Sequence, residues 1–153
     1  MSTIIRVDRS VIPVYPDWMD GVIDPELERT GLAEYDLATD VALWLHDDQK
    51  SGSVAGQAIY DYLKKHGLLE SCLGLSDALA IQKLGVAVFQ KVFDNKRVYF
   101  WKSVRRNHKG GDLFVPYLFV FGRVVLHWHR VDRHMNGLRP AVRFVSPPAT
   151  PER

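Results

Sequence analysis

The sequence predicts an α+β fold, with about three main helices packed on one face of a mostly antiparallel sheet of four to five strands. Apolar residues recur at helical spacing through much of the first 94 residues. After Asp94-Asn95 the pattern changes to runs rich in Val, Tyr, Phe and Trp, which are typical of strands. Helices grouped before strands argue against a doubly wound parallel sheet. No glycine-rich phosphate loop follows an expected strand, so nucleotide binding of that type has no support.

Length and composition favour a single globular domain. The chain has 153 residues, of which 46% are hydrophobic and 25% charged. We expect an α+β domain over residues 1–146 and a flexible, proline-rich tail over 147–153. Neither a membrane-length apolar run nor a signal-peptide pattern is present, so we expect a cytoplasmic protein without membrane contact. Its one cysteine, Cys72, leaves no partner for an intrachain disulfide.

Three elements are expected in the first 50 residues. A strand covers about 4–9, a short helical turn covers 24–28, and a longer helix covers 34–47. The longer helix is indicated by apolar residues at helical spacing: Leu37, Val41, Trp44 and Leu45.

Two further helices are expected before Asp94. One covers 54–66, with Ser53 as its N-cap. The other begins at Ser76-Asp77 and continues to about residue 92. The stretch 86–93 also fits a strand, but that reading places Lys91 in an apolar row, so the helix is preferred.

The remaining strands are expected over 97–104, 113–121, 124–131 and 141–145, with a basic loop over 105–112. Gly122-Arg123 fits a two-residue hairpin turn. That turn places Tyr117 opposite Trp128, so that the helices cover the face of Tyr117, Phe119 and Phe121.

One candidate site is a metal centre on the last expected hairpin strand. Histidines at positions i and i+2 of a strand point the same way and lie close enough to chelate a metal. The candidate ligands are His127, His129, Asp132 and His134. No wider spacing pattern supports a metal site, so we predict no cofactor and keep a divalent metal as the alternative.

A second candidate site binds polyanions. Residues 1–95 carry 15 acidic and 8 basic side chains, whereas residues 96–153 carry 3 acidic and 12 basic side chains. Aromatic residues alternating with basic ones can stack bases and hold phosphates. The candidate residues are Arg97, Trp101, Lys102, Arg105, Arg106 and Lys109. The simpler interpretation is a core strand that runs into a solvated basic loop.

The third candidate is a protein interface. The expected register groups apolar side chains with His127 and His129 on the sheet face away from the helices, where a second copy of the chain is the expected partner. The interface candidates are Leu118, Val120, Val125, Val131 and the loop residue Trp18. The leading hypothesis is therefore a non-catalytic binding or protein-interaction module that uses its sheet surface. A small metal-dependent enzyme centred on His127 and His129 and a nucleic-acid-binding protein that uses the basic C-terminal half remain open.

Overall fold

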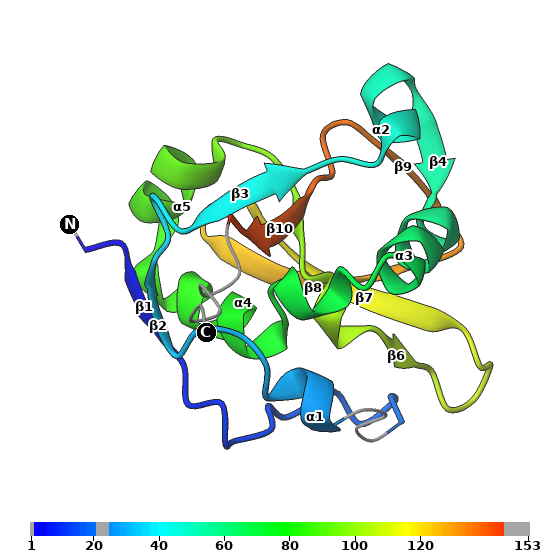
Figure 1. Cartoon of the computed structure of the whole chain (residues 1–153), viewed down its shortest axis with the longest axis horizontal. Helices are drawn as coiled ribbons and strands as arrows, with labels where there is room; N and C mark the ends of the chain where they lie inside the picture. Colours follow the sequence, from blue (N-terminus) through cyan, green and yellow to red (C-terminus); the bar gives the residue numbers. More distant parts are fainter. Residues whose placement is uncertain (1, 21–24, 146–153) are drawn as a thin grey trace, which may run out of the picture.

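The computed structural model describes residues 2–20 and 25–145 and shows a mixed α+β fold (Figure 1). The α-helices of the described residues are α1 (Pro25–Glu28), α2 (Asp47–Ser51), α3 (Gly56–Lys65), α4 (Leu75–Leu84) and α5 (Val86–Phe93). Two short 3₁₀-helices are η1 (Leu69–Ser71) and η2 (Trp101–Ser103). The α+β class is confirmed, whereas the tail expected over 147–153 lies outside the described residues.

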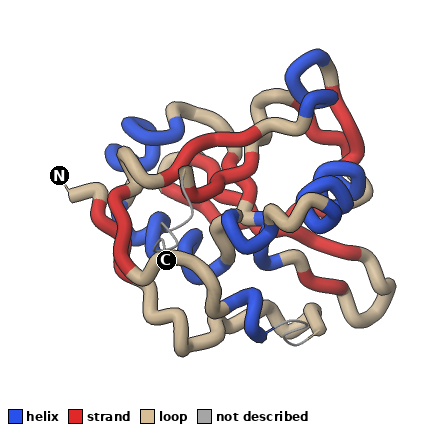
Figure 2. Tube along the Cα trace, in the orientation of Figure 1, coloured by secondary structure: helices blue, strands red, loops and turns tan. Residues whose placement is uncertain are grey.

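The main sheet is mostly antiparallel and has six strands, more than the four to five expected (Figure 2). Its strands in spatial order are β3 (Val41–Trp44), β10 (Ala141–Phe144), β5 (Val98–Tyr99), β7 (Leu113–Val120) and β6 (Arg105–Arg106), with β8 (Val124–Arg130) paired to β7. The pairing of β10 with β5 is parallel. Two smaller sheets pair β1 (Ile4–Arg6) with β2 (Glu34–Asp36) and β4 (Ser53–Ala55) with β9 (His134–Asn136).

The helices pack on both faces of the main sheet, so the expectation of one covered face is wrong. Leu118 of β7 belongs to a buried core that also contains Ile81 of α4 and Phe89 of α5. Its neighbour Tyr117 belongs to a second core, which contains Ile59 of α3. Consecutive strand residues point to opposite faces, so α4 and α5 lie against one face of the sheet and α3 against the other.

The helix expected over 34–47 is wrong, because this segment forms β2, a turn and β3. The carboxylate of Asp36 accepts a hydrogen bond from the Ala38 N–H at 2.9 Å, and that of Asp40 accepts one from the Asp36 N–H at 2.7 Å. Such local side-chain bonds favour a turn over a helix. Strands β1 and β10 then pair with β2 and β3, which overrides the helical spacing.

The helix expected over 54–66 forms as α3, but Ser53 is not its N-cap. Ser53 lies in β4, and the N-cap is Ala55. Gly56 begins the helix where the chain passes close to β8: a Cβ atom at this position would lie 2.5 Å from the carbonyl oxygen of Val131. Only glycine allows this close approach.

The helix expected from residue 76 to 92 is two helices. The helical prediction for 86–93 is confirmed by α5, but α4 and α5 are separated at Gly85, which has a φ of +93°. A left-handed residue interrupts the helical hydrogen bonds, and glycine adopts that conformation without strain. The actual N-cap of α4 is Gly74, whose N–H donates to the carboxylate of Asp77 at 2.9 Å.

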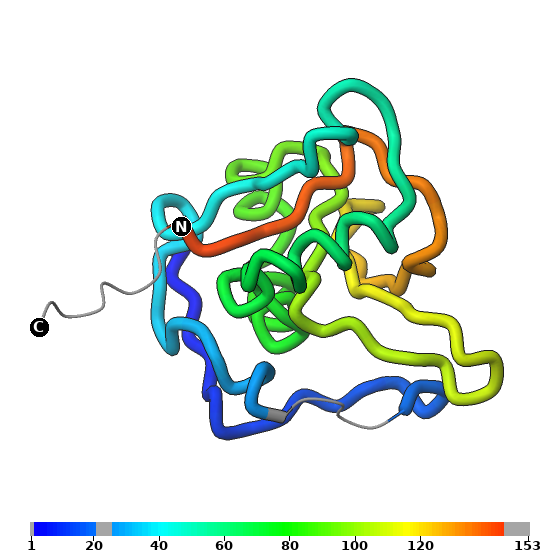
Figure 3. Tube along the Cα trace, turned by 45° about the vertical axis from the view of Figure 1, so that its right-hand side comes forward, coloured from blue at the N-terminus to red at the C-terminus, as the bar shows by residue number. Residues whose placement is uncertain are grey.

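The strand expected over 97–104 is too long. It ends at Tyr99, and the chain then bends through η2 into β6. The bend is held by Ser103, whose Oγ accepts a hydrogen bond from the Leu75 N–H at 2.7 Å. The N-terminal segment, blue in Figure 3, runs along the edge of the molecule to the end of β6, where the Asp20 N–H donates to the Arg106 carbonyl at 2.9 Å.

The hairpin of β7 and β8 forms as expected, but its register differs by one residue. Val120 lies opposite Val124, so the loop has three residues, and Tyr117 lies opposite His127 instead of Trp128. Gly122 in this loop has a φ of +74°, which suits a three-residue loop with glycine in the left-handed conformation. A shift of one residue places every side chain of β8 beside a different set of β7 residues.

Candidate functional site

The actual register brings both histidines of β8 onto the aromatic side of β7. The ring of His127 lies edge-on to Phe119 at 5.0 Å and to Tyr117 at 6.1 Å between ring centres. His129 lies edge-on to Tyr117 at 5.8 Å. Since residues two apart on a strand share a face, β7 and β8 together carry a group of aromatic and imidazole rings, in which Tyr117 is buried and Phe119, His127 and His129 are partly or fully exposed.

A row of stacked rings crosses from β5 to β7. Tyr99 stacks on Tyr117 with 4.8 Å between centres and 12° between planes, and Tyr117 stacks on Phe119 at 5.5 Å and 23°. The guanidinium carbon of Arg97 lies 4.6 Å from the Phe119 ring centre and 5.9 Å from that of Tyr117. These are cation–π distances. We call this group of residues the aromatic–basic face; its members are Arg97, Tyr99, Tyr117, Phe119, His127, His129 and Arg139, of which Tyr99 and Tyr117 are buried beneath the others.

Three polar groups form a chain at the inner end of this face. Arg139 Nη1 donates to the Tyr99 hydroxyl oxygen at 2.6 Å, and that hydroxyl lies 3.1 Å from Nδ1 of His129. The direction of the bond between Tyr99 and His129 depends on the tautomer of the imidazole, because the hydroxyl oxygen can accept from Arg139 in either case. Burial raises the pKa of Tyr99 to about 12, and burial with the nearby arginines lowers the pKa of His129 to about 4. Both groups are therefore neutral near pH 7.

The bond to Tyr99 occupies one of the two ring nitrogens of His129. The other, Nε2, is buried and has no hydrogen-bond partner among the described residues. This ring nitrogen is therefore unpaired, although three arginines lie near enough to lower the pKa of His129.

A hollow of about 360 Å³, here called the Arg97 hollow, opens beside the aromatic–basic face. It is lined by Asp94, Asn95, Lys96, Arg97, Asn136, Leu138 and Arg139. Within the described residues no carboxylate lies within ion-pair distance of Lys96, Arg97 or Arg139. Three cations against one carboxylate give this hollow a preference for anions.

Several of the expected polyanion residues are not available to a ligand. Trp101, Lys102 and Arg105 are buried. The buried Arg105 pairs with the equally buried Glu28 at 2.8 Å, and Lys102 Nζ donates to the Thr30 carbonyl at 3.0 Å. These contacts attach the N-terminal segment to η2 and β6, so the three side chains serve the fold.

The other expected polyanion residues are accessible but dispersed. Arg106 and Lys109 are exposed, and Arg106 donates to the Gly111 carbonyl in the loop after β6 at 2.9 Å. Arg97 belongs to the aromatic–basic face. The structure therefore keeps Arg97 as a ligand-binding candidate, and it adds two cations that the spacing of residues 97–109 did not indicate: Lys96 and Arg139.

The four metal candidates do not converge. Asp132 pairs with Arg130 at 2.7 Å, and His134 lies on β9, 3.5 Å from the Ser53 hydroxyl. Nδ1 of His129 is occupied by Tyr99. In the part of the chain that the structure describes, no three His, Cys, Asp or Glu side chains come together in a way that can hold a metal ion.

The interface candidates are divided between the interior and the surface. Leu118 and Val131 are fully buried, one in each core, and Val120 packs against the core of α4 and α5. The expectation that Leu118 and Val120 share a face with the histidines is wrong, because it depended on the two-residue turn. Val131 follows the alternation of the histidines but is buried in the core under α3. Val125 is half-buried opposite Phe119. Trp18 is 38% exposed and packs edge-on against Phe114 at 4.9 Å.

Comparison with known proteins gives no relative from which to infer a function: the chain matches no family model, no curated protein and no solved structure. Among the described residues, no helix has both the length and the apolar character needed to cross a membrane. The functional argument therefore depends on the geometry of the aromatic–basic face and the Arg97 hollow.

Proposed function

We propose that this protein is a non-catalytic binding module that holds single-stranded nucleic acid on the aromatic–basic face. The observation that carries the proposal is the position of Arg97. Its guanidinium lies over Phe119 and Tyr117 without a carboxylate partner in the described residues, in a hollow that also contains Lys96 and Arg139. Single strands are bound by positively charged grooves in which bases stack on aromatic rings or on arginine planes.

Each part of the face has a role in this proposal. The guanidinium plane of Arg97 covers the rings on one side and offers its other side to a base. Lys96 and Arg139 neutralise phosphates next to that base. The exposed ring of His127, edge-on to Phe119, extends the stacking surface along β8. Stacking and charge recognise every base to a similar degree, so we expect weak sequence preference.

The test is fluorescence anisotropy with labelled single strands of DNA and RNA of about 12 nucleotides. We expect binding that weakens between about 50 and 200 mM salt, because phosphate contacts release counterions. Arg97→Gln is expected to weaken binding about tenfold, the loss of one stacking platform. The matched control is Arg6→Gln, which removes the same charge from an exposed site on β1 and is expected to bind as the wild type does.

Two results would overturn the proposal. One is the absence of binding even at about 50 mM salt. The other is an equal loss of affinity in Arg97→Gln and Arg6→Gln, which indicates diffuse charge attraction without a site. If either result is found, and sedimentation also shows a dimer that Val125→Asp abolishes, the alternative of a self-association module is favoured.

A further inference from the structure

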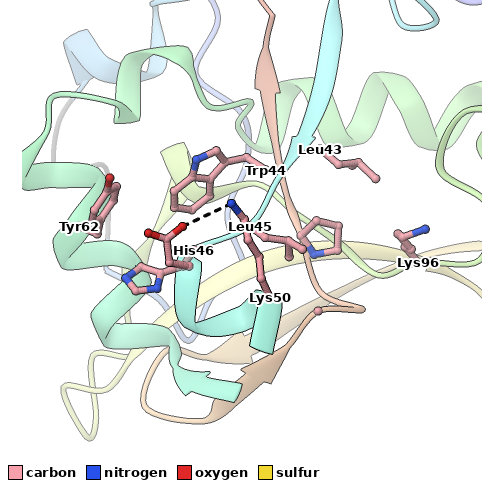
Figure 4. Close-up of a pocket in the computed structure, with 10 residues that line it drawn as sticks. Leu43, Trp44, Leu45, His46, Lys50, Tyr62 and Lys96 are labelled. Atoms are coloured by element: carbon pink, nitrogen blue, oxygen red, sulfur yellow. Dashed lines mark hydrogen bonds and ion pairs between the residues drawn. The ribbon is translucent and has the colours of Figure 1, made fainter. Parts of the chain in front are cut away.

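A second hollow, here called the Trp44 pocket, lies where β3 runs into α2 (Figure 4). Its volume is about 360 Å³, near the lower end of the roughly 300–1,000 Å³ found for small-molecule sites. That size suits a ligand fragment the size of a single nucleotide. The lining residues used below are Trp44, His46, Asp47, Lys50, Tyr62 and Lys96.

The pocket has an aromatic wall. The rings of Trp44 and Tyr62 lie 5.7 Å apart with 31° between their planes, and His46 lies edge-on to both. Tyr62 is 39% exposed, which is unusual for a large ring that already has ring neighbours. A planar ligand can therefore stack on this wall without displacing a core residue.

The polar groups of the pocket are mostly donors. His46 Nδ1 accepts the Asp48 N–H at 3.1 Å, so a neutral His46 ring carries its proton on Nε2 and can donate it. Lys50 and Lys96 add two ammonium groups; Lys50 pairs with the exposed Asp47 at 3.3 Å. An aromatic wall with imidazole and ammonium donors matches a planar base that carries a phosphate.

Lys96 lines both the Trp44 pocket and the Arg97 hollow, and the next residue, Arg97, belongs to the aromatic–basic face. The two hollows are therefore joined by adjacent cations along one stretch of backbone. We infer that the Trp44 pocket takes one unstacked nucleotide of the strand bound on the aromatic–basic face, with the base against Trp44 and Tyr62 and its phosphate beside Lys50 and Lys96. This inference rests on the proposed function.

The first experiment compares strands of about 4 and 12 nucleotides, because only the longer one is expected to span both sites. Tyr62→Ala is expected to weaken the longer strand about fivefold or more and leave the shorter one unchanged, whereas Arg97→Gln weakens both. Trp18→Ala is the matched control, since Trp18 is 38% exposed, against 39% for Tyr62, and also packs on another ring. Trp18 is not among the residues that line either hollow. Circular dichroism verifies that each variant is folded.

The second experiment follows the indole N–H resonances of the four tryptophans by NMR, with Trp44→Phe identifying the resonance of Trp44. Adenosine monophosphate is expected to shift that resonance, and ribose 5-phosphate, which lacks the base, is expected to shift it much less. The inference is overturned if Tyr62→Ala binds both strands as the wild type does, or if the monophosphate leaves Trp44 unmoved. If Arg97→Gln loses binding of the longer strand and Tyr62→Ala has no effect, the proposed function stands and the role of the Trp44 pocket is rejected. No binding of either strand rejects both.

Discussion

The hydroxyl of Tyr99 on β5 lies 3.1 Å from Nδ1 of His129 on β8, although β7 lies between these two strands. Arg139 donates to the same hydroxyl at 2.6 Å. The hydroxyl of Tyr99 thereby links Arg139 to a histidine with which Arg139 itself forms no hydrogen bond. The protonation of His129 therefore depends on residues from three separate segments of the chain, and its pKa can be measured directly.

His129 is expected to remain neutral well below pH 6.5. Burial, with Arg139, Arg133 and Arg97 nearby and Asp132 opposing them, lowers its pKa to about 4. The unfolded chain takes up a proton near pH 6.5 that the folded protein does not. The contribution of His129 to stability is therefore present above about pH 6.5 and lost as the pH falls toward 4.

The measurement is the melting temperature of the wild type and of His129→Gln across this range. The wild type is expected to lose stability more steeply with acid than His129→Gln. His127→Gln serves as control, because it removes the neighbouring imidazole of the same strand and leaves His129 intact. If the melting temperatures of the wild type and His129→Gln change in parallel with pH, His129 has the same pKa in the folded and the unfolded protein and the prediction is wrong.

Removal of the buried carboxylate of Glu28 is expected to be strongly destabilising. Glu28 accepts hydrogen bonds from Tyr15, from Ser103 at 3.0 Å and from Arg105 at 2.8 Å. Glu28→Gln leaves the Arg105 cation buried and uncompensated, which costs about 3 kcal/mol of the free energy of unfolding.

Urea denaturation measures this loss against a matched control. Glu34→Gln makes the same chemical change in an exposed pair, where Arg6 Nε lies 2.9 Å from the carboxylate. That variant is expected to stay within about 0.5 kcal/mol of the wild type. Equal effects of the two substitutions would mean that the buried pair is no more than a surface contact.

Asp94→Gly is expected to stabilise the protein, against the usual effect of glycine. Asp94 has a φ of +60° at the end of α5 and is the one described non-glycine residue with positive φ. Relief of that strain, less the added entropy of the unfolded chain, gives about 1 kcal/mol. This corresponds to a rise of about 2–4 °C in melting temperature for a chain of this length.

The control for this variant is Lys91→Gly in the same helix. Lys91 is exposed within α5, so its replacement by glycine should cost about 1 kcal/mol. Calorimetry of both variants measures their melting temperatures and shows whether Asp94→Gly stabilises or destabilises the protein. A lower melting temperature for Asp94→Gly would show that its side chain contributes more than its backbone strain costs.

Lys102 is expected to make the protein more stable as the pH rises above 8. Burial lowers its pKa to about 8, whereas the unfolded chain keeps the proton to about pH 10.5. Between these values the unfolded state binds more protons, so alkaline conditions favour folding by about 1–2 kcal/mol between roughly pH 7.5 and 9.5.

Lys102→Met isolates this effect. The pKa of buried Cys72, raised to about 12, gives an opposite trend, and Lys102 itself lowers that pKa. Both proteins are therefore compared with Cys72→Ala in place. Urea denaturation at the two pH values should show the wild type gaining stability relative to Lys102→Met. A difference that does not change with pH would place Lys102 in contact with solvent.

Features that depend on local chemistry are predictable from the amino-acid sequence. The α+β class, the helical character of 86–93 and the hairpin of β7 and β8 follow from periodicity and turn residues. Arg97 was also identified as a candidate from its neighbouring aromatic residues. These features form because the interactions that stabilise them lie within a few residues of one another.

The tertiary structure alone decided which strands pair and which faces meet. The helical spacing of residues 34–47 is overridden because β1 and β10 offer strand partners. The extra residue in the hairpin loop moves His127 opposite Tyr117, and a one-residue shift exchanges the neighbours of every side chain on a strand. Lys96 precedes Arg97 in the chain, but Arg139 joins them only because the segment before β10 lies beside β5, where the Arg97 N–H donates to the Leu138 carbonyl at 3.2 Å. No spacing in the sequence indicates that third cation of the Arg97 hollow.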